Sequence, residues 1–418
     1  MMSARKILFA LALAATFLTM SSPLAAQLVL GQYENEAPFR TWNSYPFSCA
    51  SALGRGETAL TLAADASAGL SNPALLVRLP RLSVTVSGFF LNATALRYAY
   101  INTGVLSTAA PVGRSLAGLD LAAVAYRFGG WAVSAAAADF EFYHRPAVHA
   151  EASYGGQIYY SNDFDQTGAL RGYAFSLARR IGGRLSIGLT MIAFQGEIQR
   201  SSIENSTASG YTITDTIARK FSGFAFQGGI AWEPWTGFTL ALTVRGPWTK
   251  KADGSNILRY QAPSGPTNIT IADSAMDSLG QPWIVGLGLS VQPLAGLTLA
   301  SDAVFYGWSR YAPEYFGEIQ ERGFRDILRI GAGAEYRTRI RLFGRDVDFP
   351  NRIGVLYDPQ PMAAPHSSYV YLTFGTGFHW PAFHADMGAS LGGESGSGNH
   401  LVGRRIALTL SFFLGERP

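Results

Sequence analysis

Three arginines stand in segments of this chain in which every second residue is apolar and charge is otherwise rare. They are Arg245, Arg329 and Arg352. A guanidinium presents a planar fork of donors that can hold a carboxylate through two hydrogen bonds. Because a buried charge must be paired or hydrogen-bonded, two interpretations remain open. The arginines form ion pairs within the chain, or one of them holds the carboxylate of a bound molecule.

Further charged residues fall on the same face of such segments and offer partners for the first interpretation. They are Asp302, Glu335, Asp358 and Arg405. Ion pairs among these groups would tie separate segments of the chain together. The second interpretation predicts instead that replacing one of the three arginines weakens the binding of a ligand.

No arrangement of residues indicates catalysis. His144 and His149 lie in a polar segment, and His379 and His384 flank a turn, without the spacing of a metal site. The sequence lacks a phosphate-binding loop, a cysteine pair and a Gly-x-Ser-x-Gly motif. We therefore expect no enzyme activity, no catalytic residue, no metal site and no cofactor. The single cysteine, Cys49, is expected to be a small buried apolar residue.

The elements that position the arginines are predicted to be β-strands of about ten residues. In the segment that ends at Arg245, the residues Leu240 and Leu242 fall on one face, and Thr239 and Thr243 fall on the other together with the arginine. A period of two is that of a strand, and this length suits a tilted strand that crosses a bilayer. One apolar face and one small, polar face are typical of a barrel with lipid outside and a polar lumen.

About fourteen such segments follow one another, which predicts an all-β fold, an antiparallel outer-membrane barrel. They are 82–93, 119–128, 131–142, 169–181, 185–199, 221–232, 237–249, 283–292, 297–309, 327–337, 348–358, 369–379, 383–392 and 403–415. Tight turns alternate with longer polar segments, as periplasmic turns alternate with outer loops in such barrels. The expected outer loops are 143–168, 200–220, 250–281, 310–325 and 359–368. The region 94–118 has room for an additional strand.

The composition and the first residues fit export to an outer membrane. The chain is 48% hydrophobic and only 15% charged, yet it contains no run of about eighteen apolar residues that would make a spanning helix. Arg5 and Lys6 precede an apolar stretch, and small residues follow as far as Ala26, as in a secretory signal peptide. The net charge of +4 without a concentrated basic run does not indicate nucleic-acid binding.

The chain is expected to divide into a signal peptide, 1–26, an N-terminal plug, 27–80, and a transmembrane barrel, 81–418. The plug segment does not alternate, and the small residues from Thr58 to Ala68 predict a short helix that Pro73 ends. Because a barrel of about fourteen strands leaves an open lumen, a compact segment before the first strand is well placed to fold back inside it.

Two stretches resemble the FadL family of outer-membrane transporters of long-chain fatty acids and other hydrophobic compounds. The first lies just before the first strand, and its matching residues are Asp65, Ser67, Asn72, Pro73 and Ala74. The second comprises 328–336 and 352–361, which look like that family's paired late strands. The resemblance implies a fourteen-stranded barrel in an outer membrane of a diderm bacterium, with the N-terminal segment as a hatch whose turn is formed by Asn72, Pro73 and Ala74.

The resemblance also implies passive uptake of a hydrophobic small molecule, gated by the hatch and released sideways into the membrane through a gap at a kinked third strand. The partners would be that ligand, outer-membrane lipid and the barrel-assembly machinery, without nucleic acid. In the expected third strand, 131–140, an alanine run would permit a bulge or tight packing against the hatch. The alternative is a PorV-like shuttle or interaction protein of a secretion system, which shares the barrel and carries secreted proteins.

Overall fold

The computed structural model describes residue 45 and residues 47–415, with internal gaps. The gaps are 63, 96–97, 103–104, 110–111, 145–147, 155–156, 207–209, 262–267, 312–313, 316–317, 320–322, 343, 362–365 and 397–400. The expected signal peptide and the first part of the expected plug, 27–44, lie outside the described residues, so the expected domain boundaries stay predictions.

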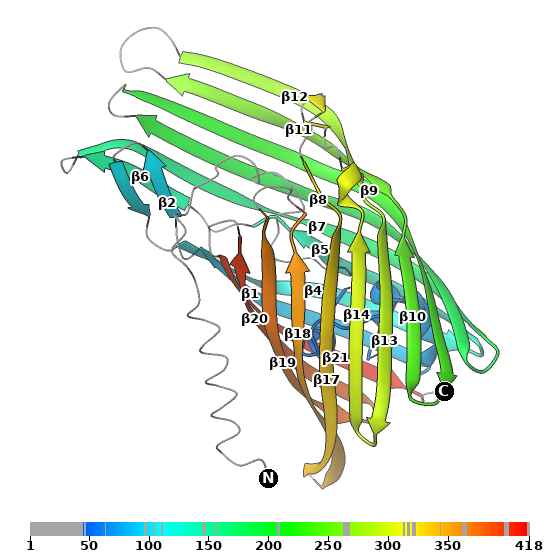
Figure 1. The fold of residues 1–418 in the computed structure, drawn as a ribbon. Coiled ribbons are helices and arrows are strands. Elements are labelled where there is room, and N and C mark those ends of the chain that lie inside the picture. Colours follow the sequence, from blue (N-terminus) through cyan, green and yellow to red (C-terminus); the bar gives the residue numbers. More distant parts are fainter. Residues whose placement is uncertain are drawn as a thin grey trace, which may run out of the picture.

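Within the described residues, fourteen antiparallel strands form a closed barrel (Figure 1). Eleven of them are continuous: β1 (Leu82–Ala95), β4 (Val112–Phe128), β7 (Gln157–Ile181), β8 (Leu185–Ser206), β9 (Tyr211–Trp235), β14 (Leu297–Tyr306), β17 (Ile327–Leu342), β18 (Arg345–Pro359), β19 (Ser368–Trp380), β20 (Phe383–Ser395) and β21 (Leu401–Leu414). Three are interrupted: β5 (Trp131–Phe142) with β6 (Val148–Tyr154), β10 (Phe238–Arg245) with β11 (Trp248–Gln261), and β12 (Asn268–Gln281) with β13 (Ile284–Leu294). The barrel closes where β1 pairs with β21, Leu82 opposite Leu414.

This architecture confirms the expected fold and corrects the expected loops. Strand ends at the short turns lie where the sequence placed them, as in β5 and at the start of β8. The segments 143–168, 200–220 and 250–281 were expected to be loops, but most of their residues belong to long strands. The reason is that backbone pairing does not require an apolar face, so the hairpins continue in polar sequence beyond the membrane.

Short elements complete the described structure. The region 94–118 contains a small hairpin of β2 (Tyr98–Asn102) and β3 (Val105–Ala109), which is paired only with itself. A second small hairpin joins β15 (Glu314–Tyr315) to β16 (Glu318–Ile319), next to the 3-10 turn η3 (Trp308–Arg310).

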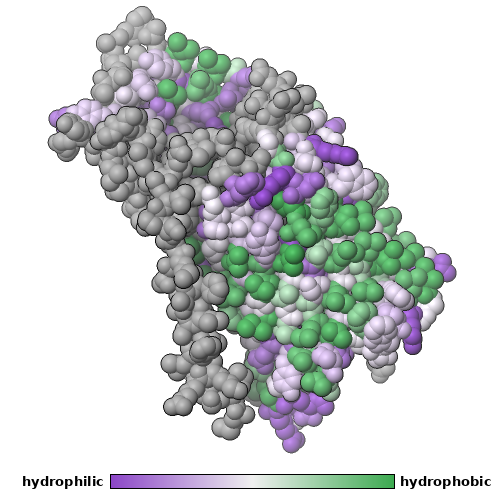
Figure 2. All heavy atoms as spheres, in the orientation of Figure 1, coloured by the Kyte–Doolittle hydropathy of each residue, from purple (hydrophilic) through white to green (hydrophobic). Residues whose placement is uncertain are grey.

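The outer surface of the barrel is apolar along its middle. Figure 2 shows a band of hydrophobic residues across the wall, with hydrophilic residues toward both ends. Leu240 and Leu242 are exposed, whereas Thr243 and Arg245 are buried toward the lumen, so the faces are oriented as predicted. No helix among the described residues is long and apolar enough to cross a membrane. The apolar band and the closed antiparallel wall are those of an outer-membrane barrel.

Trp and Tyr residues cluster near the predicted strand ends, which predicts girdles at the two membrane surfaces; they include Trp131, Trp232, Trp235, Trp248, Trp283 and Tyr336. Trp131, Trp232, Trp235, Trp283 and Tyr336 are exposed on the wall, in agreement with this. The prediction is wrong for one tryptophan of this set. Trp248 is partly buried and stacks on Phe194, with 4.4 Å between ring centroids.

The segment before β1 lies within the barrel, and we call its described residues, 45–80, the hatch (Figure 1). It contains α2 (Ala50–Leu53), α3 (Ala68–Ser71) and the 3-10 helix η2 (Pro73–Arg78). The expected helix from Thr58 to Ala68 is wrong, because only Ala68 of that stretch is helical among the described residues. Side chains of the wall bind its backbone instead: Asp302 Oδ2 accepts from the amides of Ala59 and Leu60 at 2.7 and 2.9 Å.

Candidate functional site

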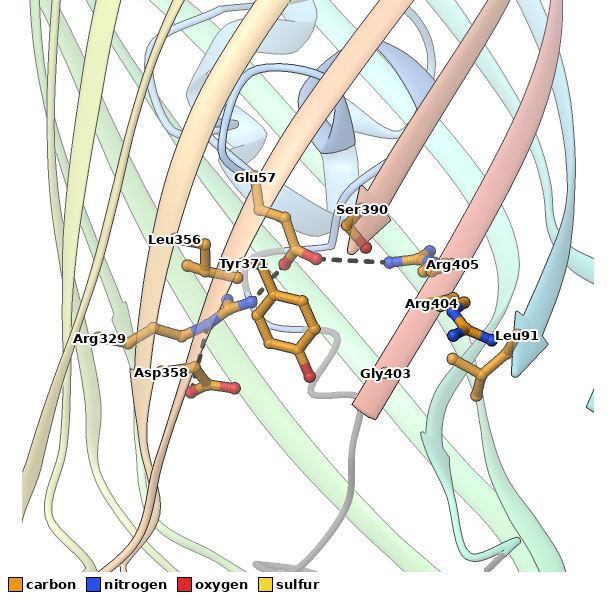
Figure 3. Close-up of a pocket in the computed structure, with 10 residues that line it drawn as sticks. All are labelled: Glu57, Leu91, Arg329, Leu356, Asp358, Tyr371, Ser390, Gly403, Arg404 and Arg405. Carbon is orange, nitrogen blue, oxygen red and sulfur yellow. Dashed lines mark hydrogen bonds and ion pairs between the residues drawn. The ribbon is translucent and has the colours of Figure 1, made fainter. Parts of the chain in front are cut away.

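A turn of the hatch places one carboxylate between two arginines of the wall. Glu57 adopts a left-handed backbone conformation, with a φ of 59°. Its side chain forms ion pairs with Arg329 and with Arg405, the latter at 3.7 Å (Figure 3). Arg329 also lies 3.5 Å from Asp358, and Arg405 lies 3.2 Å from Asp120. The cavity beside these groups is only about 20 Å³, which leaves no room for a ligand carboxylate at Arg329 in this conformation.

A second carboxylate, this time on the wall, holds the same turn of the hatch. Glu335 Oε2 lies 2.6 Å from both Arg55 of the hatch and Arg352 of β18. The other oxygen of Glu335 lies 2.7 Å from Arg337, and Arg352 forms a further ion pair with Asp386 at 2.6 Å. The expected ion-pair network therefore exists, and it joins the hatch to the wall through Arg329 and Arg352, two of the three candidate arginines.

Between these ion pairs, the hatch backbone rests directly on glycines of the wall. A Cβ atom on Gly354 would lie 2.2 Å from the Gly56 nitrogen, and one on Gly331 would lie 2.1 Å from the Gly56 oxygen. Gly54 packs in the same way on Gly375, where an added Cβ would lie 3.0 Å from the Gly54 Cα. Gly331 and Gly354 belong to the second stretch that carries the family resemblance, so that stretch forms a docking surface for the hatch.

The Asn-Pro turn of the hatch docks on another pair of glycines. Gly188 of β8 and Gly229 of β9 are direct partners in the barrel ladder. A Cβ on Gly188 would lie 2.5 Å from Pro73, and one on Gly229 would lie 2.1 Å from Asn72 Oδ1. The Asn72 side chain also accepts from the Ala74 amide at 3.1 Å and so caps η2, with Pro73 at its first position. Pro73 thus begins a helix rather than only ending one.

The remaining predicted hatch residues form a buried turn. Asp65 Oδ1 accepts a hydrogen bond from the Ser67 amide at 2.8 Å, which closes the turn before α3. Burial raises the pKa of the Asp65 carboxyl above its ordinary value, because the charged form loses its hydration. Cys49 is also buried, as expected, and burial holds the pKa of its thiol well above the ordinary value.

The third strand of the wall separates from its neighbour part of the way along. β5 pairs with β4 from Phe128 opposite Trp131 to Leu121 opposite Ala138, and the pairing ends there although both strands continue. On its other side, β5 stays paired with β7, but the register shifts between Asp139 and Glu141. Phe140 is therefore an extra residue, a β-bulge that bends the strand.

The displaced end of β5 is held by groups that sequence analysis did not identify. Glu141 Oε2 lies 2.8 Å from Lys250 Nζ of β11, and the Tyr143 hydroxyl contacts the same ammonium at 3.1 Å. Lys250 is one of the most deeply buried large side chains described in the barrel. Apolar side chains pack beside the break, with the rings of Phe89 and Phe142 at 4.9 Å between centroids.

Arg245, the third candidate arginine, lies at an aromatic pocket next to the bulge. Its guanidinium lies over the rings of Tyr45 and Phe140, at 4.3 and 5.3 Å from their centroids. It donates to Gln227 Oε1 at 3.0 Å, and the Gln227 amide donates to the carbonyls at the end of α3. The cavity is about 30 Å³ in this conformation, and its apolar lining includes Phe140, Phe194, Trp248, Ile284, Tyr306 and Trp308.

A larger apolar groove of about 630 Å³ lies on the lipid-facing side of the wall. Its lining includes Ala122 of β4 and Ala137 of β5, which form the pair next to the last pair of the β4–β5 ladder. The alanine run of β5 was expected to permit a bulge or to pack tightly against the hatch, and the bulge lies at Phe140, just beyond the run. Ala135 and Ala137 line the groove, whereas Ala132 and Ala138 are buried in the cluster that packs the hatch.

No known family model matches the sequence, and no curated protein does. Solved structures share its fold. A FadL homologue of Pseudomonas aeruginosa has a TM-score of 0.66 at 13% identity, over 87% of this chain and 98% of that chain. The toluene transporter TodX of Pseudomonas putida has 0.64 at 12%, over 90% and 99%. The toluene transporter TbuX of Ralstonia pickettii has 0.57 at 16%, over 87% and 97%.

At these identities, the likeness establishes the fold. The chain is a closed fourteen-stranded antiparallel barrel with the fold of these solved structures, and the expected resemblance is confirmed at the level of the fold. The roles of Arg245, Arg329 and Arg352 in ligand binding stay predictions.

Proposed function

We propose that this protein takes up hydrophobic small molecules passively across the outer membrane, with the hatch as its gate and the break in the wall as its exit. The observation that carries the proposal is the end of β4–β5 pairing beside the aromatic pocket. Hydrogen-bonded strands leave no sideways path through a barrel wall. A break lined by apolar side chains, next to an apolar groove on the lipid side, supplies such a path.

Among the candidate arginines, Arg245 is the one we assign to the ligand. Arg329 and Arg352 belong to the ion-pair network that joins the hatch to the wall, whereas Arg245 lines the aromatic pocket beside the break in the wall. A long-chain fatty acid would place its carboxylate at this guanidinium and its chain among the aromatic residues. The pocket is too small for an acyl chain in this conformation, so entry requires the hatch or the Phe140 ring to move.

The names of the structural neighbours add a second ligand class, because TodX and TbuX are toluene transporters. Substitution of Arg245 distinguishes the two classes. In Arg245→Met, the affinity for oleate should fall roughly ten- to a hundredfold, since one charge-assisted hydrogen bond is worth about 1.5–3 kcal/mol. The affinity for toluene should stay within about twofold. Equal losses for both ligands would show that the arginine supports the pocket rather than binding a carboxylate.

The exit is tested by removing the bulge. Deleting Phe140 brings Asp139 and Glu141 into consecutive register on β7, which allows β5 to pair again with β4. The control is Phe140→Ala, which removes the same ring from the pocket but keeps the extra residue. We expect uptake of radiolabelled oleate by cells that lack their own transporter to be lost in the deletion and retained in the control.

Equal uptake by both Phe140 variants, with both barrels folded, would contradict lateral release. Failure of the purified wild-type protein to bind either oleate or toluene would contradict the uptake function itself. The PorV-like shuttle would then become the leading hypothesis, and co-purification of a secreted protein would test it.

A further inference from the structure

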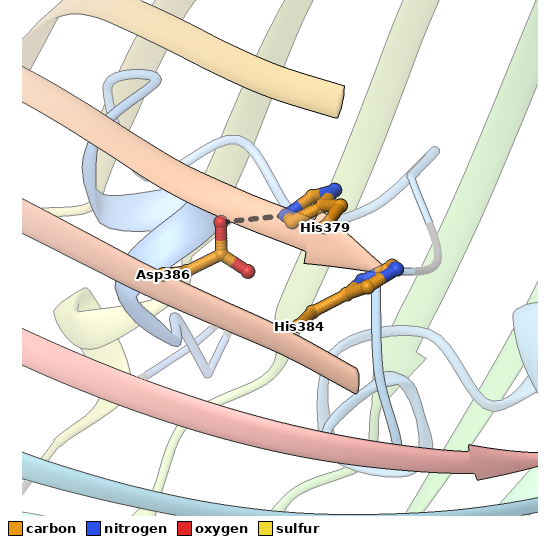
Figure 4. Close-up of side chains that lie close together, drawn as sticks. All are labelled: His379, His384 and Asp386. Atoms are coloured by element: carbon orange, nitrogen blue, oxygen red, sulfur yellow. Dashed lines mark hydrogen bonds and ion pairs between the residues drawn. The ribbon is translucent and has the colours of Figure 1, made fainter. Parts of the chain in front are cut away.

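Three metal-binding side chains meet at the rim of the barrel where the short turns lie. His379, at the end of β19, and His384, at the start of β20, are direct partners in the ladder. Their rings stack with 3.8 Å between centroids (Figure 4). Asp386 follows two residues after His384 on the same strand, so its side chain lies on the same face. The donor atoms of the three residues all lie within 4.8 Å of one another.

The spacing already matches part of a coordination sphere. His379 Nε2 lies 2.9 Å from Asp386 Oδ1. Two ligands at about 2.1 Å from a metal ion and at right angles to each other lie about 3.0 Å apart. The stacked rings do not aim both lone pairs at one point, but a rotation of the His384 ring about its Cβ–Cγ bond would turn its nitrogen toward the other two ligands.

The surroundings provide access and support. Both imidazoles line a cavity of about 550 Å³ at this end of the barrel, so an ion and its waters can enter. Asp386 is buried, and its Oδ1, the oxygen nearest His379, also accepts from Arg352 at 2.6 Å, which orients the carboxylate and leaves Oδ2 to complete the set of metal ligands. The guanidinium opposes a nearby cation, but Glu335, 2.6 Å from Arg352, offsets its charge.

We propose that His379, His384 and Asp386 bind one divalent transition-metal ion, such as Zn²⁺, Ni²⁺ or Cu²⁺. Two imidazoles and one carboxylate are ligands that these ions prefer, whereas Ca²⁺ and Mg²⁺ prefer oxygen ligands alone. The sequence alone predicts no metal site, because His379 and His384 only flank a turn. The pairing of β19 with β20 makes the two histidines neighbours, and Asp386 lies beside them. The ion would sit at the end of the chain of ion pairs that leads through Arg352 and Glu335 to Arg55 of the hatch.

The test uses the full-length protein in detergent, without a histidine tag and freed of metal by a chelator. Ni²⁺ and Zn²⁺ are titrated by calorimetry, and Cu²⁺ is observed by electron paramagnetic resonance, which detects coordinated imidazole nitrogens. The variants are His379→Gln and His384→Gln, and the control is His366→Gln, which changes an exposed histidine outside the cluster. Migration on a gel before and after heating verifies that each barrel is folded.

We expect one equivalent of ion to bind, and each cluster variant to weaken the affinity by roughly tenfold or more. The control should bind like the wild type, and the Cu²⁺ spectrum should show two nitrogens that fall to one in either cluster variant. The proposal is overturned if the wild type shows no saturable binding of any of the three ions. It is equally overturned if both cluster variants bind as the wild type does.

Discussion

The ion pairs of Glu57 are expected to contribute to the free energy that holds the hatch docked in the barrel. In Glu57→Gln, the side chain keeps its shape but loses its charge, and Arg329 loses its contact with the hatch carboxylate. The Arg405 contact, at 3.7 Å, is longer. Both arginines keep a carboxylate of the wall, Asp358 or Asp120, so neither is left as an isolated buried charge.

The expected magnitude follows from these remaining partners. Removing one partner of a buried pair costs about 3–5 kcal/mol when the other charge is left uncompensated. Here compensation persists, so the loss is that of one charge-assisted hydrogen bond, about 1.5–3 kcal/mol. The equilibrium between docked and undocked hatch should therefore shift roughly ten- to a hundredfold toward the undocked state.

Cys49 supplies the assay because it is the only cysteine of the chain and lies buried in the hatch. A maleimide can react with its thiol only after the hatch undocks, and burial disfavours the reactive thiolate in the docked state. When docking is fast relative to labelling, the labelling rate is proportional to the undocked fraction. Labelling of Glu57→Gln should therefore be about ten- to a hundredfold faster than that of the wild type, followed by mass spectrometry.

The matched control is Asp348→Asn, because the Asp348–Arg339 pair is exposed to solvent, with side-chain exposures of 43% and 72%. Such pairs contribute about 0–1 kcal/mol, so the labelling rate should change less than about fivefold. Equal rates for Glu57→Gln and the wild type, with both barrels folded, would refute the reasoning. Immediate labelling of the wild type would show that the hatch is not docked in solution.

Two further predictions use the same labelling assay. Gly229→Ala places a Cβ 2.1 Å from Asn72 Oδ1, so it should loosen the hatch and speed labelling, whereas Gly228→Ala, with nothing within 4 Å of its Cβ, should not; equal rates would contradict the docking contact. Burial in the docked hatch raises the pKa of Asp65 above its ordinary value of 3.8. Ionisation of Asp65 therefore favours the undocked hatch: the effect is absent below pH 3.8, grows as pH rises toward the raised pKa, and is complete above it. The Asp65→Asn side chain keeps an acceptor for the Ser67 amide, so Cys49 of this variant should be labelled more slowly than Cys49 of the wild type at pH 8. The difference in rate should shrink when both proteins are compared at lower pH, and a difference that stays constant would contradict this role of Asp65.

The alternation of the sequence was sufficient to predict which charges face the lumen. The charged residues that the alternation placed on the polar face are all buried, namely Arg245, Asp302, Arg329, Glu335 and Arg352. The prediction works because lipid on one side and a packed lumen on the other leave each strand residue only two environments. The partners on the hatch were not predictable, since Glu57 lies 272 positions from Arg329 in the sequence.

A change in the alternation also explains why the predictions for Trp248 and Lys250 were wrong. Arg245 faces inward at an odd position, but Trp248 and Lys250 face inward at even positions. Gly246 and Pro247 separate β10 from β11, and proline cannot donate to the ladder. The alternation therefore changes phase at this point. Trp248 consequently lies in the aromatic pocket instead of a girdle, and Lys250 holds the displaced end of β5 instead of starting an outer loop.

If the hatch is the gate that we propose, it must both seal the lumen and leave it, and its contacts suit both requirements. Glycines of the wall allow the backbone of the hatch to approach closely, which specifies where it docks. The ion pairs add direction, and the desolvation of the buried charges offsets part of their attraction. In the proposed undocking, water would enter the lumen and rehydrate Arg55 and Glu57 together with their wall partners. A hatch held by polar contacts would thus regain hydration energy on undocking that a hatch held by apolar contacts of the same area would not, so the proposed gate would be specific in position and weak enough to open.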